Sequence, residues 1–350
     1  MYPRNCWYMA GWNRDFATGA IHAETILGEA IAFYRTPARA VVALEDRCVH
    51  RLAPLSQGRC EGANLRCMYH GLLFAPDGKV VEIPGQDLVP QQACVRAYPI
   101  AERHSAVWIW MGDPALADED LIPDFVGYEH ADWAMEPGRL DYAAPASLIH
   151  DNLLDLSHIA YVHANSFAGG SAAAATGWLN ADLSAMRLDN GVRVERWMAA
   201  QPVNPAGHSA RDVETIDLWT RYDFLMPGIF LQRTERHPVG TYERSRGARP
   251  EGEPLFITFT CQAVTPLTDD TACYFFAYGP WAREAERKSF FAELGLKAFN
   301  EDRVMIEAQQ RRIATTPNPR MMPMAMDKAV LLYEGVVKRK LREEARLGAD

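Results

Sequence analysis

Short apolar segments separated by turn residues occupy the first third of the chain. Apolar or partly alternating runs predict strands at five places: Ala30–Arg35, Val41–Leu44, Lys79–Ile83, Val95–Ile100 and Ala106–Met111. Turn signals such as Pro76-Asp77-Gly78 lie between these runs. We therefore expect an all-β module here, preceded by an N-terminal segment that is helical or irregular.

The pattern changes in the second half of the chain, where helical periodicity brackets a series of strands. Helices are predicted over Ser147–His163, Ala282–Ile313 and Ala329–Leu347. Five strands are predicted between the first two helices: Gly191–Trp197, Ile216–Phe224, Ile229–Thr234, Leu255–Thr265 and Thr271–Tyr278. Strands that meander between helices predict an antiparallel sheet wrapped around a helix. The expected class is α+β, with a helix-grip (START-like) second domain.

A solvated linker separates the two patterns. It contains the acidic run Asp118-Glu119-Asp120 and the pair Pro123-Asp124. We place the boundary near residue 125, which predicts one domain over residues 1–125 and another over 126–350. The segment 164–177 is rich in Gly, Ala and Ser, so we expect a loop there, and this loop is a candidate lid.

Composition and charge narrow the class of protein. The 350 residues are 48% hydrophobic and 23% charged, as in a globular protein, and the formal net charge is −9. Neither nucleic acid nor an anionic membrane surface is an expected partner for such a chain. We see no signal peptide and no bilayer-spanning run. Five of the seven cysteines are scattered outside the motif described next, which predicts free thiols and the cytoplasm.

Two half-motifs, each with one cysteine and one histidine, carry the strongest chemical signal. Cys48-Val49-His50 is followed after sixteen residues by Cys67-Met68-Tyr69-His70. Two cysteines and two histidines can hold a [2Fe–2S] cluster, with both histidines on one iron. The alternative is a single structural zinc bound by the same four side chains. The small and apolar residues that flank both halves favour the cluster.

A second candidate metal site lies in the predicted helix over Ser147–His163. His158 and His163 are five positions apart, and on an ideal helix they point ~140° away from each other. For both imidazoles to bind one ion, the helix must bulge or end there, and we predict a π-type turn between them. A carboxylate would complete a two-histidine, one-carboxylate site for Fe(II). On the long helix, Glu301 and Asp302 are the candidates, and the spacing does not choose between them.

The chain resembles the Rieske-type aromatic oxygenases, and within them the vanillate O-demethylase and dicamba monooxygenase group. The resemblance rests on the cysteine–histidine motif, on the run from Asn152 to His163, and on Tyr2-Pro3-Arg4-Asn5 with Trp7-Tyr8. It implies His158, His163 and Asp302 as iron ligands and places Asn152 near the iron. It also implies that Asp155 bridges to His70 of a neighbouring subunit. The dicamba group uses a histidine and a tryptophan in its substrate pocket, where this chain has Gln262 and Glu293.

The same resemblance implies a function. The chain would be the terminal oxygenase component, a homotrimer that uses O₂ for O-demethylation or monooxygenation of a methoxylated aromatic carboxylate. No Gly-x-Gly-x-x-Gly fingerprint follows a strand, so electrons would come from a separate reductase, with or without a ferredoxin. The alternatives are a ring-hydroxylating dioxygenase that forms a cis-diol and, outside the enzymes, a Rieske-type electron carrier.

Overall fold

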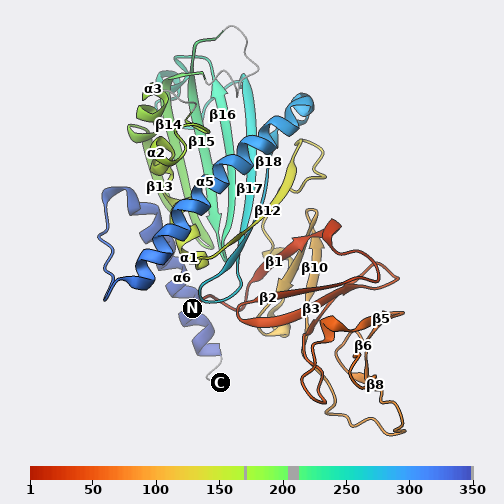
Figure 1. The fold of residues 1–350 in the computed structure, drawn as a ribbon. Coiled ribbons are helices and arrows are strands. Elements are labelled where there is room, and N and C mark those ends of the chain that lie inside the picture. Colours follow the sequence, from red (N-terminus) through yellow and green to blue (C-terminus); the bar gives the residue numbers. More distant parts are fainter. Residues whose placement is uncertain (169–171, 204–212, 348–350) are drawn as a thin grey trace. The chain divides into compact units, whose positions relative to one another are not determined.

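The computed structural model describes residues 1–168, 172–203 and 213–347 (Figure 1). The chain forms two compact units. The first comprises Met1–Ile122 and the short segment Thr265–Asp269, and the second comprises the rest of the described chain. Among the described residues, no helix is both long enough and apolar enough to cross a membrane.

Three small sheets build the first unit, so the all-β prediction is confirmed. The first sheet has the order β1 (Trp7–Trp12), β11 (Ala106–Trp110), β10 (Ile100–Arg103). The second has the order β2 (Ile21–Ile26), β3 (Glu29–Arg35), β4 (Val41–Glu45), β9 (Ala97–Tyr98). The third has the order β5 (Arg59–Glu61), β6 (Asn64–Arg66), β7 (Leu73–Phe74), β8 (Val80–Glu82).

Residues 1–6 are irregular, as expected, but the strand β1 that follows them was not predicted. All six residues of β1 are buried, and β1 pairs with β11 from Trp7 opposite Trp110 to Trp12 opposite Ala106. Because both faces of β1 are covered, its sequence does not alternate between apolar and polar residues. The pattern that marks a half-exposed strand is therefore missing.

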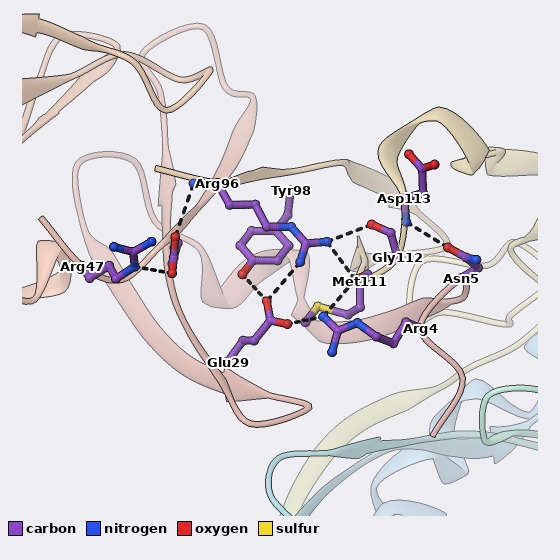
Figure 2. A network of polar contacts seen from close by, with 10 residues as sticks. Arg4, Asn5, Glu29, Arg47, Arg96, Tyr98, Met111, Gly112 and Asp113 are labelled. Carbon is purple, nitrogen blue, oxygen red and sulfur yellow. Dashed lines mark hydrogen bonds and ion pairs between the residues drawn. The ribbon is translucent and has the colours of Figure 1, made fainter. Parts of the chain in front are cut away.

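Glu29, at the start of β3, is the centre of a polar network that Figure 2 shows. Its carboxylate pairs with Arg4 and Arg96 and accepts a hydrogen bond from the Tyr98 hydroxyl. Arg96 also donates to the carbonyl oxygen of Gly112 at 2.8 Å. The network ties the N-terminal segment to β3, to β9 and to the end of β11.

A seven-stranded antiparallel sheet frames the second unit. Its spatial order is β12 (Glu136–Tyr142), β18 (Ala272–Pro280), β17 (Phe256–Pro266), β16 (Ile229–His237), β15 (Thr215–Leu225), β14 (Gly191–Pro202), β13 (Asp182–Leu188). The five predicted strands correspond to β14–β18. The two edge strands were not predicted, because β13 is mostly exposed and β12 contains Pro137 and Gly138, which argue against a strand.

Helices cover this sheet. The long helix α5 (Lys288–Thr315) crosses one face in Figure 1 and contacts β12 and β18, and α6 (Lys328–Leu347) contacts β13 and β14. Both helices were predicted, although a 3₁₀ segment over Ala282–Arg287 precedes α5. The helices α1 (Ala146–Leu154), α2 (Ile159–Val162) and α4 (Thr241–Ser245) are shorter.

The predicted loop 164–177 is partly helical. The helix α3 (Ala172–Leu179) begins inside it and packs against β14, and residues 169–171 lie outside the described part. The loop prediction is therefore wrong from residue 172 onward. The physical reason is the run of four alanines from Ala172, because alanine has the highest helix propensity and outweighs the single Gly177.

Candidate metal centres

Two loops of the same build carry the predicted cluster ligands. In each loop the backbone N–H of the cysteine donates to the carbonyl oxygen five residues later. Cys48 donates to Ala53 at 2.8 Å, and Cys67 donates to Leu72 at 2.9 Å. Cys67 directly follows β6, and Cys48 lies three residues after β4. The two cysteines therefore have the same backbone hydrogen-bonding pattern, and short strands of this unit precede both loops.

The four side chains of these loops converge. The Nδ1 atoms of His50 and His70 lie 3.2 Å apart. Cys48 and Cys67 are buried, with 2% and 1% of their surface exposed, whereas both histidines are exposed. Burial raises the pKa of the Cys48 thiol, and the adjacent Cys67 thiol adds to this, so a thiolate pair here requires a bound cation. These residues fit a [2Fe–2S] cluster whose histidine-bound iron lies at the surface.

The helix that carries the second ligand set is interrupted. After α1 ends, Asp155 is extended (φ −116°, ψ 99°), and Leu156–His158 form a 3₁₀ turn before α2 begins. His163 directly follows α2 and is no longer helical (φ −102°, ψ 26°). The distortion is therefore a break followed by a helix end, and the π-type turn that we predicted is not found. Because His163 is no longer helical, its direction is not set by the ~100° rotation per residue of an α-helix. Its imidazole can therefore point to the same side as that of His158.

The side chains of His158, His163 and Asp302 meet at one point. The Nε2 atoms of His158 and His163 lie 3.4 and 3.2 Å from Oδ1 of Asp302, and one donor atom from each residue lies within 4.8 Å of the others. Two donor atoms that are each ~2.1 Å from one ion, at right angles, are ~3 Å apart. The three side chains therefore have the spacing of a facial ligand set on one metal ion.

Both imidazoles are oriented by acceptors on their far side. The Nδ1 of His158 donates to the carbonyl oxygen of Asp155 at 2.6 Å, and the Nδ1 of His163 donates to Oε2 of Glu301 at 2.9 Å. A proton on Nδ1 leaves the Nε2 lone pair free for a metal. The two acidic candidates thus differ in position, because Asp302 faces the Nε2 atoms and Glu301 lies behind His163.

The Asp302 carboxylate is kept ionised despite its burial. Only 6% of the residue is exposed. Burial raises its pKa, but hydrogen bonds with His158 and His163 outweigh burial and lower the pKa to about 2. The Nδ2 of Asn152 also donates to Oδ1 of Asp302 at 3.0 Å. A buried carboxylate that faces the Nε2 atoms of two imidazoles is the donor set that a divalent cation needs.

The three side chains open into a cavity with a volume of about 150 Å³. The other walls come from the sheet, from α5 and from the region of α1–α3. They are mainly aromatic and aliphatic, with a few amides and hydroxyls. An open metal site on a largely apolar cavity is typical of a small-molecule site.

The two predicted pocket residues differ in position. Gln262 lines the cavity and is 3% exposed, and its Oε1 has no hydrogen-bond partner within the described chain. Glu293 is exposed and does not line the cavity. Its neighbour Leu294 does, because successive residues of a helix point ~100° apart.

Asp155 and His150 have different surroundings. The Asp155 carboxylate is half-buried and accepts hydrogen bonds from the backbone N–H and the hydroxyl of Ser157, both at 2.9 Å. His150 is buried and packs against Phe224 and Tyr333, with ring centroids 5.3 and 5.8 Å away. Burial lowers the pKa of His150 to about 3, so this histidine is a neutral core residue.

Sequence reasoning missed two side chains beside His163. The hydroxyl of Ser166 donates to Oε2 of Glu301 at 2.6 Å, and the ring of Phe167 lies 5.3 Å from the His163 imidazole and lines the cavity. Both lie in the segment that we expected to be a loop. The available signal was their place directly after a predicted ligand, since Phe167 is the one aromatic residue between 164 and 177.

Family models match both parts of the chain that carry these residues. Residues 6–99 match the Rieske [2Fe-2S] domain, and residues 142–343 match the vanillate O-demethylase oxygenase C-terminal domain. The first match covers all four predicted cluster ligands, which favours the cluster over a single zinc. The second covers His158, His163 and Asp302. Fold and site together define a Rieske-type non-haem iron oxygenase component.

Individual relatives cover the whole chain. It is 36% identical to the iron-sulfur subunit of the toluene-4-sulfonate monooxygenase system of Comamonas testosteroni, over 98% of each chain. It is 30% identical to the vanillate O-demethylase oxygenase subunit of Pseudomonas sp. strain HR199, over 98% of this chain and 96% of the relative. A crystal structure of dicamba monooxygenase bound to 3,6-dichlorosalicylic acid superposes with a TM-score of 0.87 at 27% identity, over 98% of each chain.

The chain therefore belongs to the Rieske oxygenases that carry the vanillate O-demethylase oxygenase C-terminal domain. It is an oxidoreductase whose cofactors are a [2Fe–2S] cluster and a mononuclear non-haem iron. Several relatives are named as oxygenase components or subunits, which implies that a separate reductase supplies the electrons.

Proposed function

We propose that the chain is the terminal oxygenase component of a system that oxidises a single-ring aromatic acid, by O-demethylation of a methoxylated carboxylate or by monooxygenation. The observation that carries this proposal is the ligand set of His158, His163 and Asp302 at the wall of a cavity. When iron is bound there, the open coordination positions supply the activation of O₂ for oxidation of a substrate carbon.

The size of the cavity supports a one-ring substrate. Its volume of about 150 Å³ equals that of an engineered apolar cavity, ~150 Å³, that binds benzene in another protein. A benzene ring with small substituents fits such a space. The relatives named for toluene-4-sulfonate, vanillate and dicamba act on compounds of this size.

Each nearby residue has a definite task in this proposal. Asn152 holds the Asp302 carboxylate through its amide. Glu301 fixes the ring of His163, and the Asp155 carbonyl fixes the ring of His158. Phe167 covers the His163 ring and limits access of water to the iron side of the cavity. These contacts keep both Nε2 atoms aimed at one point before iron arrives.

We assign the two cofactors to two domains. Residues 1–125 form the Rieske domain in this assignment, with Cys48, His50, Cys67 and His70 as ligands. Residues 126–350 form the catalytic domain. The extents of the two family matches, 6–99 and 142–343, support this division. So does the end of the main segment of the first compact unit at Ile122.

The assembly that we propose is a homotrimer in which Asp155 of one subunit lies beside the exposed His70 of the next. A head-to-tail arrangement of this kind closes into a ring. The electron donor is a separate reductase, acting directly or through a ferredoxin. We propose the cytoplasm as the compartment, in keeping with seven cysteines that form no disulfide. Size-exclusion chromatography with light scattering tests the trimer, and Asp155→Asn should slow cluster reoxidation without changing iron content.

The first test is the metal content of the purified protein. One [2Fe–2S] cluster and one mononuclear iron give about three irons and two acid-labile sulfides per chain. Electron paramagnetic resonance of the dithionite-reduced protein should show a cluster with a low average g value. Zinc without sulfide would refute the proposal. Iron and sulfide in equal amounts, with none taken up at His158 and His163 on addition of Fe(II), would refute the oxygenase site.

The alternatives differ in what Asp302→Ala does and in the products. In an oxygenase this substitution stops product formation while reductase still reduces the cluster. In an electron carrier it leaves reduction and reoxidation of the cluster unchanged. With a methoxylated benzoate as substrate, formaldehyde and a phenol indicate O-demethylation, whereas a cis-diol would establish the dioxygenase alternative. Glu307→Ala, five positions farther along α5 and outside the cavity lining, is the matched control.

A further inference from the structure

The strands β16 and β17 form one wall of the cavity, and a row of mainly polar side chains, which we call the polar column, runs along this wall. Alternate residues of β16, from Phe230 to Arg236, line the cavity, as do alternate residues of β17 from Thr258 to Gln262. The register pairs Phe230 with Gln262 at one end and Arg236 with Phe256 at the other. The column therefore ends in a guanidinium, the only cationic side chain that lines the cavity within the described residues.

Arg236 has no anionic partner in the described part of the chain. Its Nη1 donates to the Thr258 hydroxyl at 3.2 Å, and the Tyr278 hydroxyl is a second side-chain partner. Its buried Nε has no hydrogen-bond partner among the described residues. On the same sheet, Arg193 is paired with Asp223 at 2.7 Å. Arg196 of β14 is buried and also has an Nε without a hydrogen-bond partner in the described chain, but it does not line the cavity. A guanidinium remains charged inside a protein, and an unpaired buried charge is costly. A bound anion is the ligand that would satisfy both the charge and the free N–H.

Apart from the Tyr278 hydroxyl, the described side chains around Arg236 are hydrogen-bond donors and aromatic rings, with no carboxylate among them. The guanidinium carbons of Arg236 and Arg287 lie 5.3 and 5.2 Å from the centroid of the Phe256 ring. The centroids of the Trp281 and Phe256 rings lie 6.1 Å apart. Nη1 of Arg287 and Nε1 of Trp281 are also buried N–H groups without partners in the described chain. Among the described residues, no carboxylate pairs with either of these two guanidinium groups.

The donor end lies away from the iron ligands. Phe256, beside Arg236, stacks on Phe291 of α5 with ring centroids 5.7 Å apart. Phe291 and Asp302 both line the cavity. They are eleven positions apart on α5, so their backbones are ~16 Å apart along the helix axis. A one-ring substrate whose acidic group lies at Arg236 must therefore direct the opposite side of its ring toward Asp302.

We propose that Arg236 binds the carboxylate or sulfonate of the substrate at the end of the cavity remote from the iron ligands, so that the substituent para to the acidic group is the one oxidised. This rests on the proposed function and names the feature of the substrate that the site selects. Arg236 contacts the substrate, and Arg287 strengthens the positive potential around it. Thr258 orients the guanidinium through its hydroxyl.

Equilibrium binding to the full-length protein with its metals tests this assignment without turnover. The probes are toluene-4-sulfonate and 4-methoxybenzoate, each compared with its neutral amide, toluene-4-sulfonamide or 4-methoxybenzamide. Arg236→Gln should weaken binding of the two acids by about ten- to a hundredfold, as expected for loss of a hydrogen bond to a charged group. Binding of the amides should change less than about twofold. Arg236→Lys should recover part of the loss, because it keeps the charge but not the planar fork.

Arg221→Gln is the matched control. Arg221 lies on the neighbouring strand β15, does not line the cavity, and has a side chain that is 33% exposed. Its substitution should leave binding of all four probes unchanged. An equal loss of acids and amides in Arg236→Gln, or no loss of acids, would overturn the assignment. Inorganic sulfate that binds as tightly as toluene-4-sulfonate would also overturn it, because the aromatic ring would then contribute nothing.

Turnover provides a second test. With reductase present, 4-methoxybenzoate should be demethylated faster than 2-methoxybenzoate, and the preference should shrink in Arg236→Gln. A preference for the ortho isomer would contradict the para assignment. If no compound is turned over by the unaltered protein, the proposed function fails, and the binding comparison still decides whether Arg236 recognises the acid.

Discussion

Replacement of Glu301 by glutamine tests how the iron site is oriented. The Oε2 of Glu301 accepts hydrogen bonds from Nδ1 of His163 at 2.9 Å and from the Ser166 hydroxyl at 2.6 Å. Glutamine keeps the shape and one acceptor oxygen but removes the charge, and a charged acceptor makes roughly twice as strong a hydrogen bond as a neutral one. The expected outcome is weaker iron binding with the ligand set intact.

The size of the effect follows from the position of Glu301. Loss of a residue that orients a metal-bound histidine typically costs 10–100-fold in metal affinity, which is ~1.4–2.7 kcal/mol. Asp302→Asn should cost more, because Asp302 faces both Nε2 atoms. We expect a graded series in which Glu301→Gln retains weak iron binding and Asp302→Asn retains none at micromolar Fe(II).

The assay is titration of the apo mononuclear site with Fe(II) under anaerobic conditions, in competition with a chelator. The signal of the [2Fe–2S] cluster in the same sample is an internal standard for intact protein. Glu307→Gln is the control, since Glu307 also lies on α5 but accepts from the backbone N–H of Ala143. Equal affinities in Glu301→Gln and the unaltered protein would refute the orienting role. If Glu301→Gln lost iron binding as completely as Asp302→Asn, the result would indicate that Glu301 is itself an iron ligand.

Three further predictions concern stability and the cluster. Burial and the nearby Glu334 and Asp327 raise the pKa of Asp151 from 3.8 to about 6. The folded state therefore loses stability as this group ionises between pH ~4 and ~7, on the order of 3 kcal/mol, and Asp151→Asn should raise the melting temperature at pH 8 but not at pH 4. A Cβ on Gly112 would lie 1.9 Å from the Asn5 amide oxygen, which is drawn beside it in Figure 2, so Gly112→Ala should lower the free energy of unfolding by ~1–3 kcal/mol. In the control Gly335→Ala on α6, the added Cβ meets no atom, so this variant should not be destabilised. Equal melting temperatures of the two variants would contradict this prediction. Cys67→Ser should abolish the visible absorption of the cluster, and Cys94→Ser, at an exposed site, should leave it unchanged.

The parts of the molecule that could be predicted are those specified by nearby residues. The spacing of Cys48, His50, Cys67 and His70 was sufficient because each half lies in one tight loop, whose backbone hydrogen bonds close within five residues. The central strands of the second unit were predicted for a similar reason, since runs of β-branched and aromatic residues mark them locally.

The parts that could not be predicted depend on contacts between distant residues. Glu301 and Asp302 are neighbours on α5, and only the fold shows that Asp302 faces His158 while Glu301 lies behind His163. Arg236 drew no attention in the sequence, because a guanidinium on a strand is usually paired or solvated. Its role became apparent only from its place in the cavity wall and from the lack of a carboxylate partner within the described residues.

The single turn α2 has a consequence for the order of the metal-free protein. It consists of four residues between a 3₁₀ turn and a loop, so its own backbone hydrogen bonds stabilise it little. His158 and His163 flank it, and Asp302 lies on the much longer α5. Bound iron therefore acts as a cross-link, and by mass action its binding free energy adds to the cost of opening this turn. In the apo protein, hydrogen exchange at the amides of α2 should quicken while the middle of α5 stays protected.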